Sequence, residues 1–233
     1  MKIFGIQLIV VSLLFLAHLG TQAQETISFA PKGRVLNMDF DATMNGLIPN
    51  KGGYPLFVPL NGLEVKTLIN EQMLDLPADK GLIVPHSSIL QPDGSMWISS
   101  VRVGVRASGK TGMVMSQTND RHGYAIYLLD GAVYAAVSTD DSVIILQENS
   151  DSILHDCSKS MVRIDLEIKA DEAILLLNRA IVASAPLTAP LDGADNMPLR
   201  IGNHESLPGF LTEKEIPANG IFGAISTLQL WRQ

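Results

Sequence analysis

The segment from Gly104 to Thr111 has the residue types of a phosphate-binding loop. Its letters, GVRASGKT, match G-x-x-x-x-G-K-[ST], and Ile126–Asp130 resembles the apolar strand that ends in a metal-binding aspartate. Such a loop holds phosphates only when a helix begins at its lysine, because the free N–H groups of that helix bind them. Here Gly112 follows directly, and Met113–Thr118 has the composition of a strand. We therefore interpret the segment as a turn and not as a nucleotide site.

Two pairs of aspartates are candidates for a metal site. Asp39 and Asp41 stand at the end of an expected strand, and Asp140 and Asp141 stand in an expected turn. Calcium takes several oxygen ligands from carboxylates and loop carbonyls, so either pair would suit Ca²⁺. Neither pair has the regular ligand spacing of an EF-hand, and aspartates are common in turns.

Other residue types used in catalysis are scattered along the chain. The histidines form no zinc motif, and the sequence has no G-x-S-x-G esterase elbow. Cys157 is the single cysteine, so no disulfide can form within the chain. His155 lies two residues away in a polar segment and gives only weak support for a catalytic pair, so we interpret the thiol as buried and inert.

These residues are carried by segments in which apolar and polar residues alternate with a period of two, as in half-buried strands. The longest is Met96–Ala107, which would place Trp97, Val101, Val103 and Val105 in the core and Ser100, Arg102 and Arg106 at the surface. Val162–Lys169 repeats the pattern, with Arg163, Asp165, Glu167 and Lys169 outward. We expect these carboxylates to pair with Arg102 or Arg106 on the neighbouring strand, or to share an open ligand-binding face with them.

Turn residues divide the remainder into short strands. Asp130–Gly131 and Asn178–Arg179 each separate two apolar runs by two residues, as in a tight hairpin. Ala42–Gly62 is rich in glycine and proline and is expected to be a long loop. We expect no helix longer than a turn or two, and about a dozen strands, which indicates an all-β, two-sheet antiparallel sandwich.

The N-terminal segment and the net charge of the chain indicate its location and its possible partners. Residues 1–23 have the lysine, the apolar run and the small residues of a signal peptide, which we expect to be cut after Ala23. We expect residues 24–34 to form an N-terminal extension and residues 35–233 to form one domain. We expect a secreted protein, extracellular or periplasmic, with no membrane span after cleavage. The formal net charge of −7, one unit more negative without Lys2, argues against a nucleic-acid partner.

The order of the strands resembles the laminin G-like, concanavalin A-like jelly-roll superfamily of lectins and glucanases. The matching segments are Gly62–Val65, Met73–Pro77, Ser87–Leu90, Met96–Val103, Gly123–Gly131, Val162–Ile168, Leu199–Asn203 and Phe222–Trp231. This resemblance implies a concanavalin A-like jelly-roll sandwich and a carbohydrate ligand. The chain departs from the family at Asn178–Arg179, Ser226–Thr227 and Lys159–Val162.

Within that superfamily, Arg163–Glu167 is similar to a glucanase strand that carries its carboxylates at alternate positions. Retaining glycoside hydrolysis requires two carboxyl groups. The resemblance would put the nucleophilic glutamate at position 163, where this chain has arginine. We therefore expect no enzymatic activity.

The sequence predicts a non-catalytic binding or adhesion module whose ligand is a glycan. Rim loops Ala42–Gly62 and Gly202–Gly220 would reach it. The alternatives are a structural or protein-interaction module of the cell envelope, with an extracellular protein as partner, and a divergent glycoside hydrolase. Trp97 and Trp231 are expected in the core. The candidate ligand-binding residues are Arg102, Arg106, Asp165 and Glu167 on the strands, and Tyr54, Phe57 and Phe210 as exposed aromatics in the loops.

Overall fold

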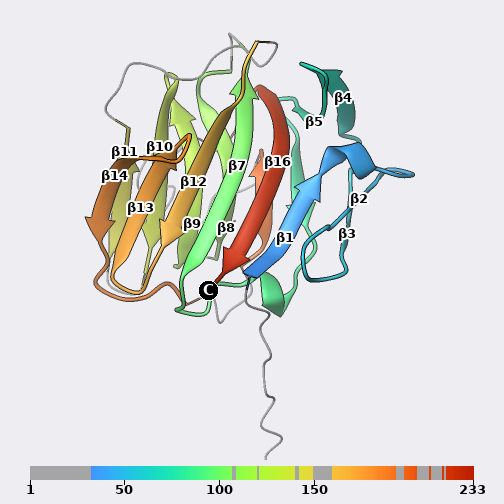
Figure 1. Cartoon of the computed structure of the whole chain (residues 1–233). Coiled ribbons are helices and arrows are strands. Elements are labelled where there is room, and N and C mark those ends of the chain that lie inside the picture. The colour runs from blue at the N-terminus through green and yellow to red at the C-terminus, as the bar shows by residue number, and fades with distance from the viewer. Residues whose placement is uncertain are drawn as a thin grey trace, which may run out of the picture. The chain divides into compact units, whose positions relative to one another are not determined.

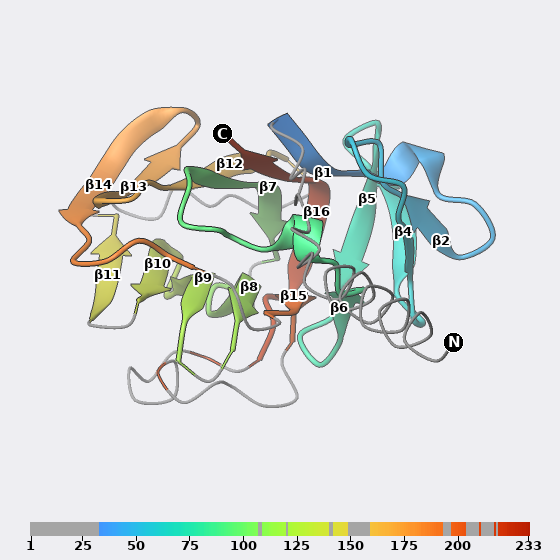
Figure 2. The ribbon, with the colours of Figure 1, turned by 90° about the horizontal axis from the view of Figure 1, so that it is seen from below.

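The fold is built mainly from two facing antiparallel sheets. The structure is a computed structural model. It describes residues 33–106, 109–119, 121–139, 142–148, 159–192, 197–203, 210, 217 and 219–233. Figure 1 shows the larger sheet in front, and Figure 2 shows the two layers edge-on. The all-β, two-sheet antiparallel sandwich that the sequence predicts is confirmed, and it has the form of a jelly roll. In the described part of the chain, no helix is both long and apolar enough to cross a membrane.

The larger sheet has eight strands. Its order is β14-β13-β12-β7-β16-β5-β4, and β1 pairs with the part of β16 that β5 leaves open. The bounds are β1 (Gly33–Asp39), β4 (Glu64–Leu68), β5 (Glu71–Leu76), β7 (Trp97–Val105), β12 (Val162–Ile168), β13 (Glu172–Leu177), β14 (Ala180–Pro186) and β16 (Gly223–Arg232). The long C-terminal strand β16 therefore joins the first strand to the middle of the sheet.

The smaller sheet has six strands in the order β11-β10-β9-β8-β15-β6. The bounds are β6 (Gly81–Val84), β8 (Gly112–Thr118), β9 (Gly123–Leu129), β10 (Ala132–Ser138), β11 (Val143–Gln147) and β15 (Leu199–Gly202). The edge strands β11 and β14 lie side by side, which closes one side of the sandwich (Figures 1 and 2). Strand β6 forms the opposite edge of the smaller sheet.

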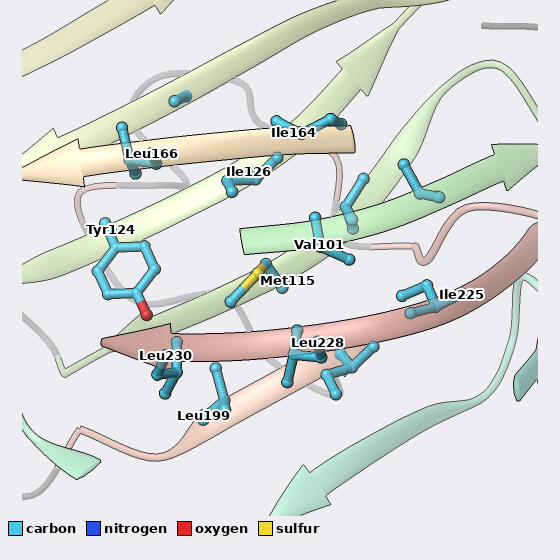
Figure 3. Packing of buried hydrophobic residues seen from close by; sticks show 14 of the residues in the cluster. Val101, Met115, Tyr124, Ile126, Ile164, Leu166, Leu199, Ile225, Leu228 and Leu230 are labelled. Carbon is cyan, nitrogen blue, oxygen red and sulfur yellow. The ribbon is translucent and has the colours of Figure 1, made fainter. Parts of the chain in front are cut away.

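The core lies between the sheets and follows from the alternating pattern. Val101 on β7, Ile164 on β12 and Leu228 on β16 face Met115 and Ile126 of the smaller sheet (Figure 3). All five side chains are completely buried. The core face predicted for Met96–Ala107 is confirmed, because its four apolar residues are at most 1% exposed. Burial of apolar surface on this scale is the dominant stabilising contribution to a fold that has no disulfide.

A chain of polar side chains crosses this apolar interior. Trp97 Nε1 donates to Tyr124 Oη at 3.2 Å, and Tyr124 Oη donates to Gln117 Oε1 at 3.0 Å. The amide nitrogen of Gln117 donates to the carbonyls of Leu90 and Met197. Unpaired polar groups in a core cost free energy. This chain of hydrogen bonds therefore fixes the positions of the two sheets relative to each other and to the backbone at Leu90 and Met197.

The hairpin turns follow the predicted chemistry. Asp130 and Gly131 have φ of 51° and 88°, and Asn178 and Arg179 have φ of 49° and 73°. Positive φ at both central residues matches the right-handed twist of the flanking strands, which is why these dipeptides make tight hairpins. The phosphate-loop pattern is also a turn in its described part, because β8 begins at Gly112, two residues after Lys110, and no helix starts there.

Two short strands lie in the segment that the sequence analysis assigned to a loop. Ala42–Gly62 contains β2 (Leu47–Pro49) and β3 (Phe57–Pro59), which form a separate hairpin, and the 3-10 turn Phe40–Ala42 precedes them. A second 3-10 turn covers Ser88–Leu90. The loop interpretation was wrong because only Ile48 and Val58 of this hairpin are buried, so its prolines and glycines conceal the strand pattern.

Candidate functional site

The four charged candidates from the strands share the outer face of the larger sheet. Arg102 lies opposite Arg163 in the register of β7 and β12, and Asp165 lies opposite Ser100. Side chains on opposite partners point to the same side of a sheet, so Arg102, Arg106, Asp165 and Glu167 all face outward. The predicted common face is therefore present.

Three of these candidates, Arg102, Arg106 and Asp165, are already paired, and not with one another as predicted. Arg102 binds Glu71 with two contacts of 2.8 and 2.6 Å. Arg163 Nε contacts both oxygens of Asp165 at 2.9 Å. Asp165 of β12 therefore binds the arginine two residues away on its own strand and not Arg102 or Arg106.

Asp75 of β5 makes the most extensive of these pairs. It contacts Arg106 Nη2 and Lys66 Nζ, each at 2.5 Å, and is 7% exposed. Burial raises the pKa of Asp75, but the hydrogen bonds and charges of Lys66 and Arg106 outweigh burial and hold that pKa below its ordinary value. The carboxylate is therefore charged at neutral pH and engaged by both cations.

This pairing argues against the outer face as a ligand or hydrolytic site. A retaining glycosidase needs a free nucleophilic carboxylate beside an acid. Asp165 is 5% exposed and is held by the arginine that replaces the expected nucleophile. Because Arg102, Arg106 and Asp165 are each held in an ion pair, the loops offer the better place for a ligand site.

The aromatic candidates lie in three different environments. Phe57 on β3 is 62% exposed, as expected, whereas Tyr54 is half-buried and its carbonyl accepts a hydrogen bond from Asn50. Phe210 is only 6% exposed, so its predicted exposure was wrong. It packs with Tyr127 on the outer face of the smaller sheet, where Tyr127 stacks on Tyr134 at 5.3 Å. The contact between Phe210 and that face is tertiary and has no local signal.

The two tryptophans also differ. Trp97 is in the core, as predicted. Trp231 lies opposite Ile98 on the outer face of the larger sheet and is half-buried, with the Arg34 guanidinium 4.7 Å from its ring centroid. The core assignment of Trp231 was wrong because β16 shifts register between Ile225 and Thr227, which changes which residues face inward.

Two of the four aspartates predicted as metal ligands have partners within the protein. Asp39 pairs with Lys51 at 2.8 Å, and Asp41 accepts a hydrogen bond from the backbone N–H of Gln72 at 3.3 Å. Asp140 and Asp141 lie outside the described residues. Among the residues that are described, no three His, Cys, Asp or Glu side chains come together as a metal site.

A polar pocket of about 410 Å³ lies at the β6 edge of the smaller sheet. Residues from three separate segments line it, and two of these segments belong to the predicted rim loops. Asn61 comes from Ala42–Gly62, and Asn203 comes from Gly202–Gly220. The lining residues are Asn61, Asp79, Lys80, Gly81, Ile83, Arg200 and Asn203.

The backbone around the pocket is held by hydrogen bonds to the turn between β5 and β6. Asn203 N donates to the Lys80 carbonyl at 3.2 Å, and Asn203 Nδ2 donates to the Asp79 carbonyl at 2.9 Å. Gly220 N donates to the Ala78 carbonyl at 3.1 Å. Three successive carbonyls of the turn are therefore bonded to segments far away in the sequence. A Cβ on Gly81 would lie 2.5 Å from the Asn203 carbonyl oxygen, so only glycine permits this close approach.

The lining combines the groups that recognise a small polar ligand. Asn61 and Asn203 carry amides, Lys80 and Arg200 carry cations, and Ile83 presents a side chain that is 50% exposed. Pockets of this size commonly hold small molecules. Of these residues only Asn61 has a local signal, because Asn61-Gly62 is a turn dipeptide whose φ values are 50° and 81°. The other lining residues meet only through the pairing of β6 with β15.

The solved structures that are similar to this fold include binding domains of toxins. No protein-family model and no curated protein sequence matches the chain. The binding domain of Paraclostridial Mosquitocidal Protein 1 has a TM-score of 0.67 at 13% identity, over 86% of this chain and 49% of that chain. The receptor binding domain of botulinum neurotoxin D has a TM-score of 0.63 at 9% identity, over 86% and 49%.

A third similar structure is the ligand binding domain of botulinum neurotoxin serotype D in complex with N-acetylneuraminic acid. Its TM-score is 0.64 at 11% identity, over 86% of this chain and 47% of that chain. The chain thus spans about half the length of the structures it matches. At these identities the similarity establishes a shared β-sandwich fold of the jelly-roll type.

Proposed function

We propose that this chain is a secreted, non-catalytic carbohydrate-binding module of the laminin G-like, concanavalin A-like kind, and that its ligand binds in the pocket at the β6 edge. The observation that carries the proposal is that both predicted rim loops contribute to one preorganised polar pocket. The toxin domains with this fold are binding domains, and one of them holds a sialic acid, which supports a binding role.

The chemistry of the pocket suits a sugar. A sugar ring presents hydroxyl groups that donate and accept hydrogen bonds, together with apolar C–H faces. Asn61 offers both a donor and an acceptor, the Asp79 carboxylate accepts, and Ile83 offers an apolar contact. Since three turn carbonyls are already bonded, the frame loses little freedom on binding, which favours affinity.

The pocket also favours binding over hydrolysis. Asp79 is the single carboxylate among its described lining residues, whereas hydrolysis of a glycosidic bond by the common mechanisms uses two. We accordingly expect no release of reducing sugar from β-glucans by the mature protein. Release that Glu167→Gln abolishes would instead support the divergent hydrolase.

A glycan array with the mature protein tests the proposal. We expect binding that Asn61→Ala weakens and that Asn45→Ala leaves unchanged. Asn45 is a matched control because it also starts an Asn-Gly turn, with φ of 52°, but lies outside the pocket. Absence of binding across a broad array, or equal losses in both variants, would contradict the proposal.

A protein-interaction module is the second candidate, and the β2–β3 hairpin favours it. Leu47 and Phe57 on this hairpin are 40% and 62% exposed, and Met44, which bridges to Leu47 just before it, is 71% exposed. Exposed apolar side chains gathered on one element are typical of protein contact sites. Capture of an extracellular protein that Phe57→Ala abolishes, with a silent glycan array, would favour this function.

Calcium binding stays a proposal for Asp39, Asp41, Asp140 and Asp141. A bound ion stabilises the folded state in proportion to its occupancy. If Ca²⁺ binds, the melting temperature should fall when a chelator is added and recover with excess calcium. An identical melting temperature in both conditions would remove calcium from the description of this module.

A further inference from the structure

The outer face of the β2–β3 hairpin is wholly apolar. Ile48 lies opposite Val58 in its register, and both are completely buried, so this pair makes the inner face. Side chains alternate between the two sides along a strand, and opposite partners share a side. The remaining four positions of the two strands therefore form the outer face, which we call the hairpin face and which consists of Leu47, Pro49, Phe57 and Pro59.

The hairpin face is exposed, and its backbone is held in place. Phe57 is 62% exposed. Two of the four residues are prolines, and proline fixes its own φ angle. Hydrogen bonds close the hairpin at both ends, from Asn50 N to the Leu56 carbonyl at 2.8 Å and from Leu60 N to the Gly46 carbonyl at 2.9 Å. A ligand that covers Phe57 would therefore order little of the protein, which favours affinity.

The prolines also limit the kind of contact that the hairpin can make. A proline has no N–H to donate, so it interrupts a hydrogen-bond ladder and protects an exposed strand from pairing with another chain. Pro49 is in β2 and Pro59 is in β3, so both strands carry this protection. The hairpin face is therefore suited to stacking against a ligand and not to the addition of a strand.

The hairpin face adjoins the polar pocket along β3. Phe57 and Pro59 are the outward positions of this strand, and Asn61, two residues further on, lines the pocket. Leu60, between Pro59 and Asn61, packs against the core. At about 3.3 Å per residue of extended chain, Phe57 and Asn61 are at most about 13 Å apart. Strand β3 also contacts β6, and Figure 2 shows β2 and β6 on the side of the molecule away from β11 and β14.

A saccharide chain has the chemistry that both surfaces can bind. Its rings present hydroxyl groups at their rims and C–H groups on their faces. Asn61 and Asp79 can bind hydroxyls in the pocket. The face of the Phe57 ring carries partial negative charge and can stack against C–H groups. The four residues of the hairpin face are uncharged, so the rings that they contact can be neutral.

We propose that the ligand is an oligosaccharide that extends from the pocket onto the hairpin face, with one ring in the pocket and a later ring stacked on Phe57. This inference rests on the proposed carbohydrate-binding function and adds a second subsite to the same site. A monosaccharide reaches only the pocket, whereas a chain of several rings reaches Phe57 as well. The module therefore prefers the inner part or the end of a long glycan over a single sugar.

The dependence of binding on chain length tests the second subsite. The probes are glucan, xylan, mannan, galactan, chitin and sialylated oligosaccharides, each series running from the monosaccharide to the hexasaccharide on one array. For the series that binds, calorimetry should show an affinity about tenfold or more higher for the long members than for the monosaccharide, because an exposed aromatic ring is covered. The heat capacity change of binding should also become more negative with length, since more apolar surface is buried.

Variants locate the effect. Phe57→Ala should lower the affinity of the long members to that of the monosaccharide and leave the monosaccharide unchanged, whereas Phe57→Tyr keeps a ring and should keep the affinity. Asn61→Ala should weaken binding at every length, because it removes a group of the pocket. Ile181→Ala is the control, since Ile181 is 67% exposed on the edge strand β14 and should leave every affinity unchanged.

The outcomes separate this inference from the proposed function. Equal affinity at all lengths, lost in Asn61→Ala, would overturn the second subsite and keep the sugar site in the pocket. An equal loss at every length in Phe57→Ala would also overturn the subsite. Capture of an extracellular protein that Phe57→Ala abolishes, with saccharide binding intact, would assign the hairpin face to a protein instead. Binding of no series at any length would overturn both proposals.

Discussion

Asp75 shows how single charges are held on the outer face of the larger sheet. Its carboxylate is almost buried between Arg106 and Lys66, and its pKa lies below its ordinary value of 3.8. We expect Asp75→Asn to lower the free energy of unfolding by about 1–2 kcal/mol at pH 7, because a charged acceptor of two hydrogen bonds is lost. Glu64→Gln is the control, since this mostly exposed carboxylate contacts Lys66 at 3.3 Å and should matter little.

The pH dependence of that difference follows from the direction of the pKa shift. A depressed folded-state pKa stabilises the protein above the ordinary value of 3.8, and the contribution is lost as the pH falls through the folded-state pKa. Urea unfolding of wild type and Asp75→Asn should therefore differ at neutral pH and converge in acid. A difference that grows below pH 3.8 would contradict the assignment.

Tyr124 is a second residue whose ionisation is tied to folding. Burial raises the pKa of Tyr124 to about 12, and its hydroxyl links Trp97 to Gln117. We expect Tyr124→Phe to cost about 1–2 kcal/mol of unfolding free energy at pH 7, because it leaves those two partners unpaired. Tyr54→Phe, on a half-buried residue outside this chain of bonds, is the control for denaturant unfolding.

A raised tyrosine pKa makes the free energy of unfolding depend on pH in the opposite direction to that of Asp75. The stability that Tyr124 contributes is present below its ordinary pKa of 10.0 and is lost as the pH rises toward about 12. The deficit of Tyr124→Phe should therefore shrink in alkali. A deficit that stays constant from neutral pH to pH 12 would show that Tyr124 does not act through this ionisation.

The Asn50 side chain adds to the backbone hydrogen bonds and the buried contacts that attach the β2–β3 hairpin to the sandwich. Asn50 Oδ1 accepts from the amides of Asn37 at 2.7 Å and Gly52 at 2.8 Å, and Nδ2 donates to the carbonyls of Val35 at 3.0 Å and Tyr54 at 2.6 Å. Four hydrogen bonds use the full capacity of one amide. The hairpin is thus fixed to β1 by bonds that no periodicity in the sequence reveals.

Asn50→Ala tests this attachment. We expect the free energy of unfolding to fall by about 2–4 kcal/mol, since the four backbone partners lose their hydrogen bonds. Limited proteolysis should then cut first within residues 42–62. Asn45→Ala, in the turn that precedes β2, is the control, and equal protease resistance of the two variants would show that Asn50 does not hold the hairpin.

At the scale of the whole molecule, one continuous core joins both sheets. Residues from β1 to β16 belong to the same buried cluster, and the first strand pairs with the last. We expect one cooperative unfolding transition, with far-ultraviolet dichroism and tryptophan fluorescence changing together, because Trp97 lies in that core. Reductant should not change the midpoint, since Cys157 has no partner cysteine within the chain. Separate midpoints for the two probes would mean that the sheets unfold independently.

Alternation and turn preferences are properties of neighbouring residues, so most of the strands, the tight hairpins and the core face of Met96–Ala107 could be predicted from the sequence, whereas β2 and β3 were missed. The role of Ala42–Gly62 and Gly202–Gly220 in ligand binding stays a prediction; these segments contribute Asn61 and Asn203 to the pocket. The tertiary structure alone decided that Arg102 pairs with Glu71, that Trp231 faces outward and that Phe210 is buried. These outcomes depend on strand order, register shifts and contacts between distant segments, which no local pattern encodes.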